Sequence, residues 1–111
     1  MHIYFKNKEL EKAASDPKRC AKKFGQLRAT LFMRRLAEMH RAETLEDMRN
    51  MPGHYHELTG DRKGQWACSL DNPYRLIFEP HERPTPTDSD GRSIWMEIKG
   101  VEIVEVVDYH N

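Results

Sequence analysis

The pattern of apolar and polar positions divides the chain into a helical first half and a second half made mostly of strands. Between residues 17 and 41 apolar side chains recur every three or four positions, which predicts helix with one buried face. Ser15-Asp16-Pro17 indicates where it begins, because an N-cap candidate precedes a proline at the first helical position. A shorter helix is expected over residues 7–14, and the aromatic, β-branched segment 2–6 predicts a strand.

Two arginines interrupt the apolar face of this helical region. Arg28 and Arg35 project within the sector that the apolar side chains occupy. Three explanations fit: Gly25 breaks or turns the helix, the arginines extend their charged ends to an edge of the apolar surface, or they face a bound partner. The periodicity does not separate them.

After residue 44 the pattern changes to short strands separated by turns. Thr44-Leu45-Glu46-Asp47 is a capping signal for a short helix that ends at Met51-Pro52-Gly53. Strands are predicted over residues 54–58, 65–70, 74–79, 94–98 and 101–107, and the proline-rich segment 80–93 predicts a surface loop. The order of elements indicates an α+β fold, with an N-terminal strand and helices packed on an antiparallel β-meander sheet, as a single domain over residues 1–111.

Charge is distributed unevenly although the formal net charge is zero. Residues 1–75 hold 15 Lys and Arg against 10 Asp and Glu, and residues 76–111 hold 3 against 8, so the two parts carry +5 and −5. Two interpretations fit the basic part: it binds a phosphate or an acidic partner, or its Lys and Arg side chains are simply solvated on helix faces.

The cysteines and the apolar runs bear on the protein's environment. Cys20 and Cys68 have neither metal-ligand spacing nor a disulfide framework, which predicts buried free thiols. No apolar run reaches the ~18–20 residues of a membrane helix and no signal-peptide pattern opens the chain, so we expect a cytoplasmic protein with no membrane partner.

Polar side chains suited to proton transfer and phosphate binding collect around the predicted strands, where an antiparallel meander can bring them to one face. They are His56, Arg62, Lys63, Arg75, Asp108, Tyr109 and His110. Metal-free RNA cleavage needs a base for the ribose 2′-hydroxyl, cations for the phosphate and an acid for the leaving oxygen, and histidine can act as base or acid near neutral pH. A metal site is disfavoured, since His54 and His56 lack a Cys or carboxylate ligand at suitable spacing. No glycine-rich phosphate loop and no Ser or Cys nucleophile with a base beside it is evident.

Structural roles fit the same residues. Arg75 interrupts an apolar strand, and it either faces solvent, pairs with Asp108 or Glu79, or stabilises a phosphate. Asp108-Tyr109-His110 is either a polar end to the last strand or a proton-transfer group. Trp66 and Phe78 fit the core better than a base-stacking role.

Three motifs in fixed order carry a family resemblance. They are His56-Glu57-Leu58-Thr59-Gly60-Asp61-Arg62-Lys63-Gly64-Gln65-Trp66, then Asn72-Pro73-Tyr74-Arg75-Leu76-Ile77-Phe78, then Asp108-Tyr109-His110. From about residue 50 to the end, the chain resembles the HigB toxins (plasmid-maintenance killer proteins) of the RelE/ParE superfamily. That family reads H-x-L-K-G-D-R-x-G-x-W, then x-Y/W-R-I-x-F, then a terminal D-Y-H.

The resemblance implies a RelE-like fold and a ribosome-dependent endoribonuclease that cuts messenger RNA in the ribosomal A site. It also implies silencing by a HigA-like helix-turn-helix antitoxin, contact with operator DNA only through the antitoxin complex, and no cofactor. By position, the functional residues of the family fall on His56, Arg75 and Asp108-Tyr109-His110, with Arg62 and Lys63 as RNA-backbone contacts.

The chain departs from the family pattern at two places. Thr59 stands where the family often has Lys before the Gly-Asp-Arg turn, and the loop over residues 80–93 is longer than the family's tight hairpin. These departures and the zero net charge favour an alternative, in which the chain is a non-catalytic binding module: a degenerate regulator of a killer system or a gyrase-binding toxin of the ParE branch. The intact His56 and Asp108-Tyr109-His110 favour the nuclease.

Overall fold

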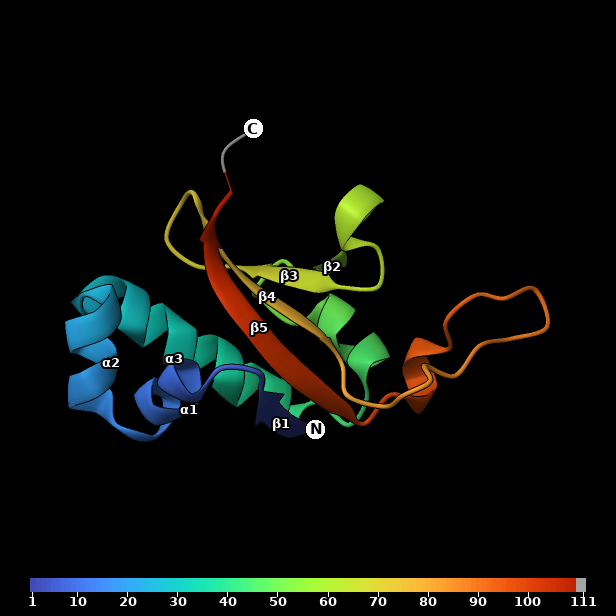
Figure 1. Cartoon of the computed structure of the whole chain (residues 1–111), viewed down its shortest axis with the longest axis horizontal. Coiled ribbons are helices and arrows are strands. Elements are labelled where there is room, and N and C mark those ends of the chain that lie inside the picture. The colour runs from blue at the N-terminus through green and yellow to red at the C-terminus, as the bar shows by residue number, and fades with distance from the viewer. Residues whose placement is uncertain (110–111) are drawn as a thin grey trace.

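One five-stranded sheet with helices against one face organises the computed structural model, which describes residues 1–109 (Figure 1). Its strands are β1 (His2–Phe5), β2 (His56–Glu57), β3 (Trp66–Ser69), β4 (Tyr74–Pro80) and β5 (Gly100–Asp108), in the spatial order β1-β5-β4-β3-β2. Neighbours from β2 to β5 pair antiparallel, and β1 pairs parallel with β5. The predicted α+β fold and antiparallel meander are therefore confirmed.

The helical half contains three helices, α1 (Lys8–Ser15), α2 (Pro17–Phe24) and α3 (Gln26–Arg41). The side chains of Asn7 and Asp16 accept backbone N–H bonds and cap α1 and α2, because the first turn of a helix leaves its N–H groups without partners. Gly25 has a φ of 81°, which glycine adopts without a Cβ clash, and it separates α2 from α3. The structure therefore confirms one of the three explanations for Arg28 and Arg35, namely that the helix breaks at Gly25.

Both of those arginines have partners within the chain. The Arg28 guanidinium donates to the two carboxylate oxygens of Asp71 at 2.9 and 3.0 Å and lies 3.4 Å from the Tyr74 ring centroid. Arg35 is buried, donates to the Glu38 carboxylate at 3.1 and 3.2 Å, and donates through Nε to the Ser69 carbonyl at 2.7 Å. They therefore tie α3 to the sheet.

Three short 3₁₀ helices complete the chain: η1 (Leu45–Asn50), η2 (Gly60–Arg62) and η3 (Trp95–Glu97). The predicted capping signal is confirmed at η1, where Thr44 and Asp47 form a capping box. The strand predicted over residues 94–98 is wrong, because η3 occupies that segment. Its Trp95 ring packs edge-on against Trp66 with centroids 5.4 Å apart, and the Ile98 carbonyl accepts a bond from the Leu45 N–H, so no strand neighbour is needed.

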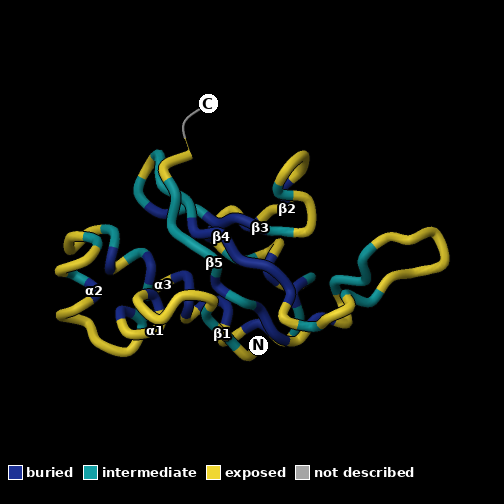
Figure 2. Tube along the Cα trace, in the orientation of Figure 1, coloured by how far each residue is buried: buried dark blue, intermediate teal, exposed yellow. Residues whose placement is uncertain are grey.

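The two faces of the sheet are packed differently. The face under the helices holds the main core, with Trp66, Leu76, Phe78 and Ile103 fully buried. In Figure 2, β3 and β4 are the strands drawn mostly as buried. The opposite face, called here the open face, carries only a small apolar cluster. Its buried members are Leu58, Ala67 and Ile77, with Val104 and Val107 packed against them. Trp66 and Phe78 are core residues, as predicted.

Two further expectations concern the thiols and the helices. Cys20 and Cys68 are buried and free, as predicted. Burial raises the pKa of the Cys68 thiol, which disfavours the reactive thiolate. Among the helices of residues 1–109, none is long and apolar enough to cross a membrane.

Candidate functional site

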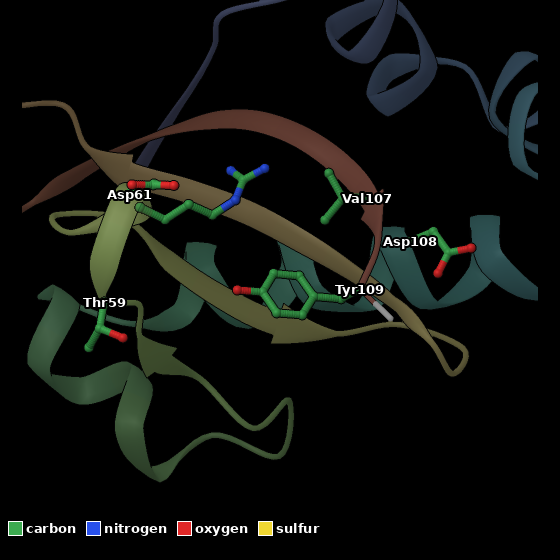
Figure 3. A pocket seen from close by; sticks show the side chains of 6 residues that line it. Thr59, Asp61, Val107, Asp108 and Tyr109 are labelled. Carbon is green, nitrogen blue, oxygen red and sulfur yellow. The ribbon is translucent and has the colours of Figure 1, made fainter. Parts of the chain in front are cut away.

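A cleft on the open face joins the Gly-Asp-Arg turn to the end of β5. This terminal cleft has a volume of about 480 Å³. The residues that line it are Thr59, Asp61, Arg62, Val107, Asp108 and Tyr109. Two of the three sequence motifs, whose nearest residues are 42 positions apart in the chain, therefore meet at this cleft (Figure 3).

Asp108 and Tyr109 point in opposite directions. Asp108 is the last residue of β5 and lies opposite Tyr74, whose ring packs against the main core, whereas Val107 lies on the open face. Successive side chains of a strand alternate between faces, so Tyr109 returns to the side of Val107. Figure 3 shows the Tyr109 ring extending across the cleft toward Asp61 and Thr59, while the Asp108 carboxylate points the other way.

Arg62 is held at the cleft by two side chains of the open face. Its Nη2 donates to Glu105 Oε2 at 2.9 Å, and its Nη1 donates to Gln65 Oε1 at 3.0 Å. Guanidinium has five N–H donors, so three remain after these two contacts. Arg62 is the only cation among the described residues that line the cleft; it is paired with Glu105, and Asp61 and Asp108 also line the cleft.

The contacts of Arg62 continue across the open face. Gln65 donates to Glu79 at 3.3 Å, and Glu79 also accepts from Lys6 at 3.2 Å and from Arg83 at 2.7 Å. Burial acts to raise the pKa of Glu79, but the hydrogen bonds from Arg83 and Lys6 outweigh burial and hold that pKa below its usual range. Glu79 is therefore ionised, and Gln65 links it to Arg62 by donating to Glu79 and accepting from Arg62.

The remaining predicted site residues lie around the cleft without lining it. His56 pairs with Ala67 and Arg75 pairs with Val107, so both lie on the open face by register. The Nδ1 of His56 is 2.8 Å from the His54 carbonyl, and Arg75 donates to the Tyr74 carbonyl at 3.1 Å. Lys63 lines a separate groove beside the long loop. His110 lies outside the described residues.

Three cleft-associated residues were missed by the sequence interpretation: Glu105, Gln65 and Asp61. The register of β5 shifts opposite Ile77 and Phe78, which leaves Val104 without a cross-strand partner and turns Glu105 to the open face opposite Ile77. Glu102 and Glu105 are three positions apart and would face opposite sides of a regular strand, but the bulge puts both on the open face. Asp61 and Gln65 lie within the first motif, but no role was predicted for either side chain.

Comparison with known proteins finds similarity in the fold alone. No family model matches the chain, and no curated protein matches its sequence. Two of the solved structures that match do so over nearly the whole chain. A YoeB-YefM complex from Staphylococcus aureus matches with a TM-score of 0.58 and 13% identity, covering 100% of this chain and 98% of that one. A YoeB/ParE toxin from Agrobacterium tumefaciens matches with a TM-score of 0.51 and 10% identity, covering 99% and 100%.

The chain has the fold of the YoeB and ParE toxins. On that fold, the open face presents one guanidinium with donors to spare and one phenol in a single cleft, with an imidazole (His56) on the edge strand β2, which β3 and β4 separate from β5. These groups can bind a phosphate and exchange protons. Among residues 1–109, no group of three or more His, Cys, Asp or Glu side chains is arranged to hold a metal ion.

Proposed function

We propose that the chain is a HigB-like toxin of a type II toxin–antitoxin pair and that it cleaves messenger RNA in the ribosomal A site. The observation that carries the proposal is the terminal cleft, where Arg62 of the first motif and Tyr109 of the last motif line the same surface of a toxin-type fold. A phosphate in this cleft would meet the spare donors of Arg62.

The chemistry would proceed without a metal ion or other cofactor. A base removes the proton of a ribose 2′-hydroxyl, the oxygen attacks the adjacent phosphorus, and an acid protonates the departing 5′-oxygen. We assign the proton transfers to His56 and His110, assisted by Tyr109, and the charge on the phosphate to Arg62 and Arg75. Asp108, whose carboxylate points away from Tyr109, would act by orienting the end of β5 rather than by touching RNA.

The proposed partners are the ribosome, messenger RNA and a HigA-like helix-turn-helix antitoxin, with operator DNA contacted only through the antitoxin complex. The YoeB neighbour is itself in a complex with YefM, which supports a protein partner for this fold. A cytoplasmic location follows from these partners.

Expression without antitoxin tests the proposal. Growth should arrest, and primer extension on translating ribosomes should reveal new 5′ ends at A-site codons. His56→Ala and His110→Ala should each lower cleavage by about 10²–10⁴-fold, the range of acid–base catalysis. The matched control is His40→Ala, an exposed histidine at the end of α3 that should cleave normally. Full cleavage by both site variants, with the fold intact, contradicts the assigned chemistry.

A non-catalytic binding toxin of the ParE branch, or a degenerate regulator, is the second candidate. Glu105 neutralises Arg62, two acidic residues line the cleft, and Thr59 supplies no cation there. The Agrobacterium neighbour is named a YoeB/ParE toxin, which fits the ParE branch. Growth arrest with no new 5′ ends, together with capture of gyrase, would support a ParE-type toxin.

A further inference from the structure

A second hollow lies beside the terminal cleft. This loop-side groove, of about 900 Å³, lies between the β2–η2 segment and the long loop before η3. The residues used below are Leu58, Thr59, Lys63, Asp90, Arg92 and Trp95. Thr59 lines both hollows, so the groove continues the terminal cleft away from Tyr109.

The far wall of the groove is built by the long loop, which extends well beyond the sheet (Figure 1). Thr87 and Ser93 form a β-bridge, and the Asp88 side chain accepts the backbone N–H groups of Asp90 and Arg92 at 2.8 and 3.0 Å. At its end, Trp95 packs against the buried Trp66. Arg92 is therefore presented from an internally bonded hairpin anchored to the core.

Unlike Arg62, which is ion-paired with Glu105, the cations of the groove have no acidic partner among the described residues. Lys63 and Arg92 are exposed, and neither side chain forms an ion pair or hydrogen bond among the described residues. Of the two acids that line the groove, Glu57 is paired with Arg49 at 2.6 Å, which leaves Asp90. The unpaired charge therefore favours an anionic ligand, while Leu58 and the half-buried Trp95 supply apolar wall.

We propose that the loop-side groove binds the single-stranded RNA that flanks the phosphate in the terminal cleft, with Lys63 and Arg92 contacting its backbone. The inference rests on the proposed function, since it takes RNA as the substrate. A strand leaving the cleft past Thr59 enters the groove directly, and two cations beside an aromatic wall are the elements from which sequence-tolerant single-strand sites are built. The long loop would then extend the RNA-binding surface.

Binding of a short single-stranded RNA with 2′-O-methyl riboses tests the inference, because such RNA cannot be cut by 2′-hydroxyl attack. Affinity would be measured by fluorescence anisotropy over a range of salt concentrations. The double variant Lys63→Ala/Arg92→Ala should bind about tenfold more weakly, and the slope of log K against log salt should fall by about 1.4, or about 0.7 per lost phosphate contact. Asp90→Asn should bind more tightly.

The control is Lys12→Ala/Lys22→Ala, which removes the same charge from exposed positions on α1 and α2. It should leave the affinity and slope near those of the wild type. An equal loss in both double variants, no loss in either, or no RNA binding by the wild-type protein overturns the inference. So does loss of antitoxin binding with RNA binding unchanged, which would assign the groove to a protein partner. Failure of cleavage on the ribosome bears on the proposed function alone.

Discussion

Glu105 is the residue that most changes what the terminal cleft can do. It lies 2.9 Å from Arg62, and both side chains are partly exposed, at 45% and 31%. An ion pair exposed to this degree contributes below about 1 kcal/mol to stability, because water screens both charges. The pair therefore matters more for the charge of the cleft than for the fold.

Replacing Glu105 by Gln should release the charge of Arg62 without loosening the protein. We expect the KM for RNA to fall several-fold under the proposed function. The free energy of unfolding should stay within about 0.5 kcal/mol of the wild type. Steady-state cleavage and urea denaturation measure the two quantities. A loss of kcat in Glu105→Gln, with KM unchanged, would instead show that the carboxylate positions Arg62 for the reaction.

At the residue scale, the sequence predicted which chemical groups are present better than where they point. Arg62 and Tyr109 do meet in one cleft, and the ion pair of Arg62 with Glu105 holds η2 against the open face of β5. Asp108 and Tyr109 diverge because β5 continues through Asp108 and strand alternation separates neighbours, a consequence that the sequence already contained. The orientation of Glu105 could not be predicted from strand alternation, because it depends on the bulge in β5.

At the scale of elements, Arg28 fastens α3 to the turn between β3 and β4. The guanidinium binds both Asp71 oxygens and covers the Tyr74 ring. The hydrogen bond from Arg28 lowers the pKa of Asp71 below its ordinary value. A lowered pKa in the folded state means that the carboxylate contributes stability above the unfolded pKa of about 3.9, and that this contribution is lost as pH falls through the folded value.

Asp71→Asn should therefore cost about 1 kcal/mol at pH 7. The difference from the wild type should shrink as pH falls below ~4 and be lost as pH falls through the folded value, because the wild-type carboxyl then becomes protonated as well. Urea unfolding at a series of pH values measures it. Asp90→Asn, on the exposed loop, is the control and should match the wild type throughout. A constant difference at every pH would contradict the ionic origin of the effect.

Elements were predictable where local chemistry decides them. Asn7, Asp16 and the Thr44–Asp47 box mark helix starts through bonds within four residues, so the sequence shows them directly. The segment over residues 94–98 has β-branched and aromatic residues typical of a strand. Its 3₁₀ conformation depends on the contacts of Trp95 and Ile98 with residues 29 and 53 positions away. Tertiary contacts of that kind override local propensity.

At the scale of the whole molecule, the charge asymmetry along the sequence is partly neutralised in space. Lys6 pairs with Glu79 and Arg62 pairs with Glu105, so basic residues of the first part meet acidic strands of the second part on the open face. The charge count predicted a basic region and an acidic region but could not show that β1 and η2 lie beside β4 and β5. The net charges of +5 and −5 on the two parts of the sequence therefore do not form two separate surfaces.

A buried polar network joins the helical layer to the sheet. The Tyr55 hydroxyl donates to the Glu38 carboxylate at 2.7 Å, Glu38 accepts from Arg35, and Arg35 donates to the carbonyl of Ser69 in β3. All three side chains are buried. Gly53 is needed beside them, because a Cβ there would lie 2.7 Å from Arg35 Cδ and 2.7 Å from the Tyr55 ring. The network therefore makes the helices and the sheet depend on each other for stability.

Tyr55→Phe tests this dependence. The change removes one donor from a buried carboxylate at almost constant volume, so the free energy of unfolding should fall by about 1–2 kcal/mol. The midpoint of thermal unfolding should drop by about 4–8 °C per kcal/mol. Because the network spans both layers, helix loss in far-ultraviolet circular dichroism and exposure of Trp66 in fluorescence should still shift together. Tyr4→Phe, at an exposed tyrosine, is the matched control and should be nearly neutral. Helix loss at a lower temperature than Trp66 exposure in Tyr55→Phe would show that the two layers are stable independently.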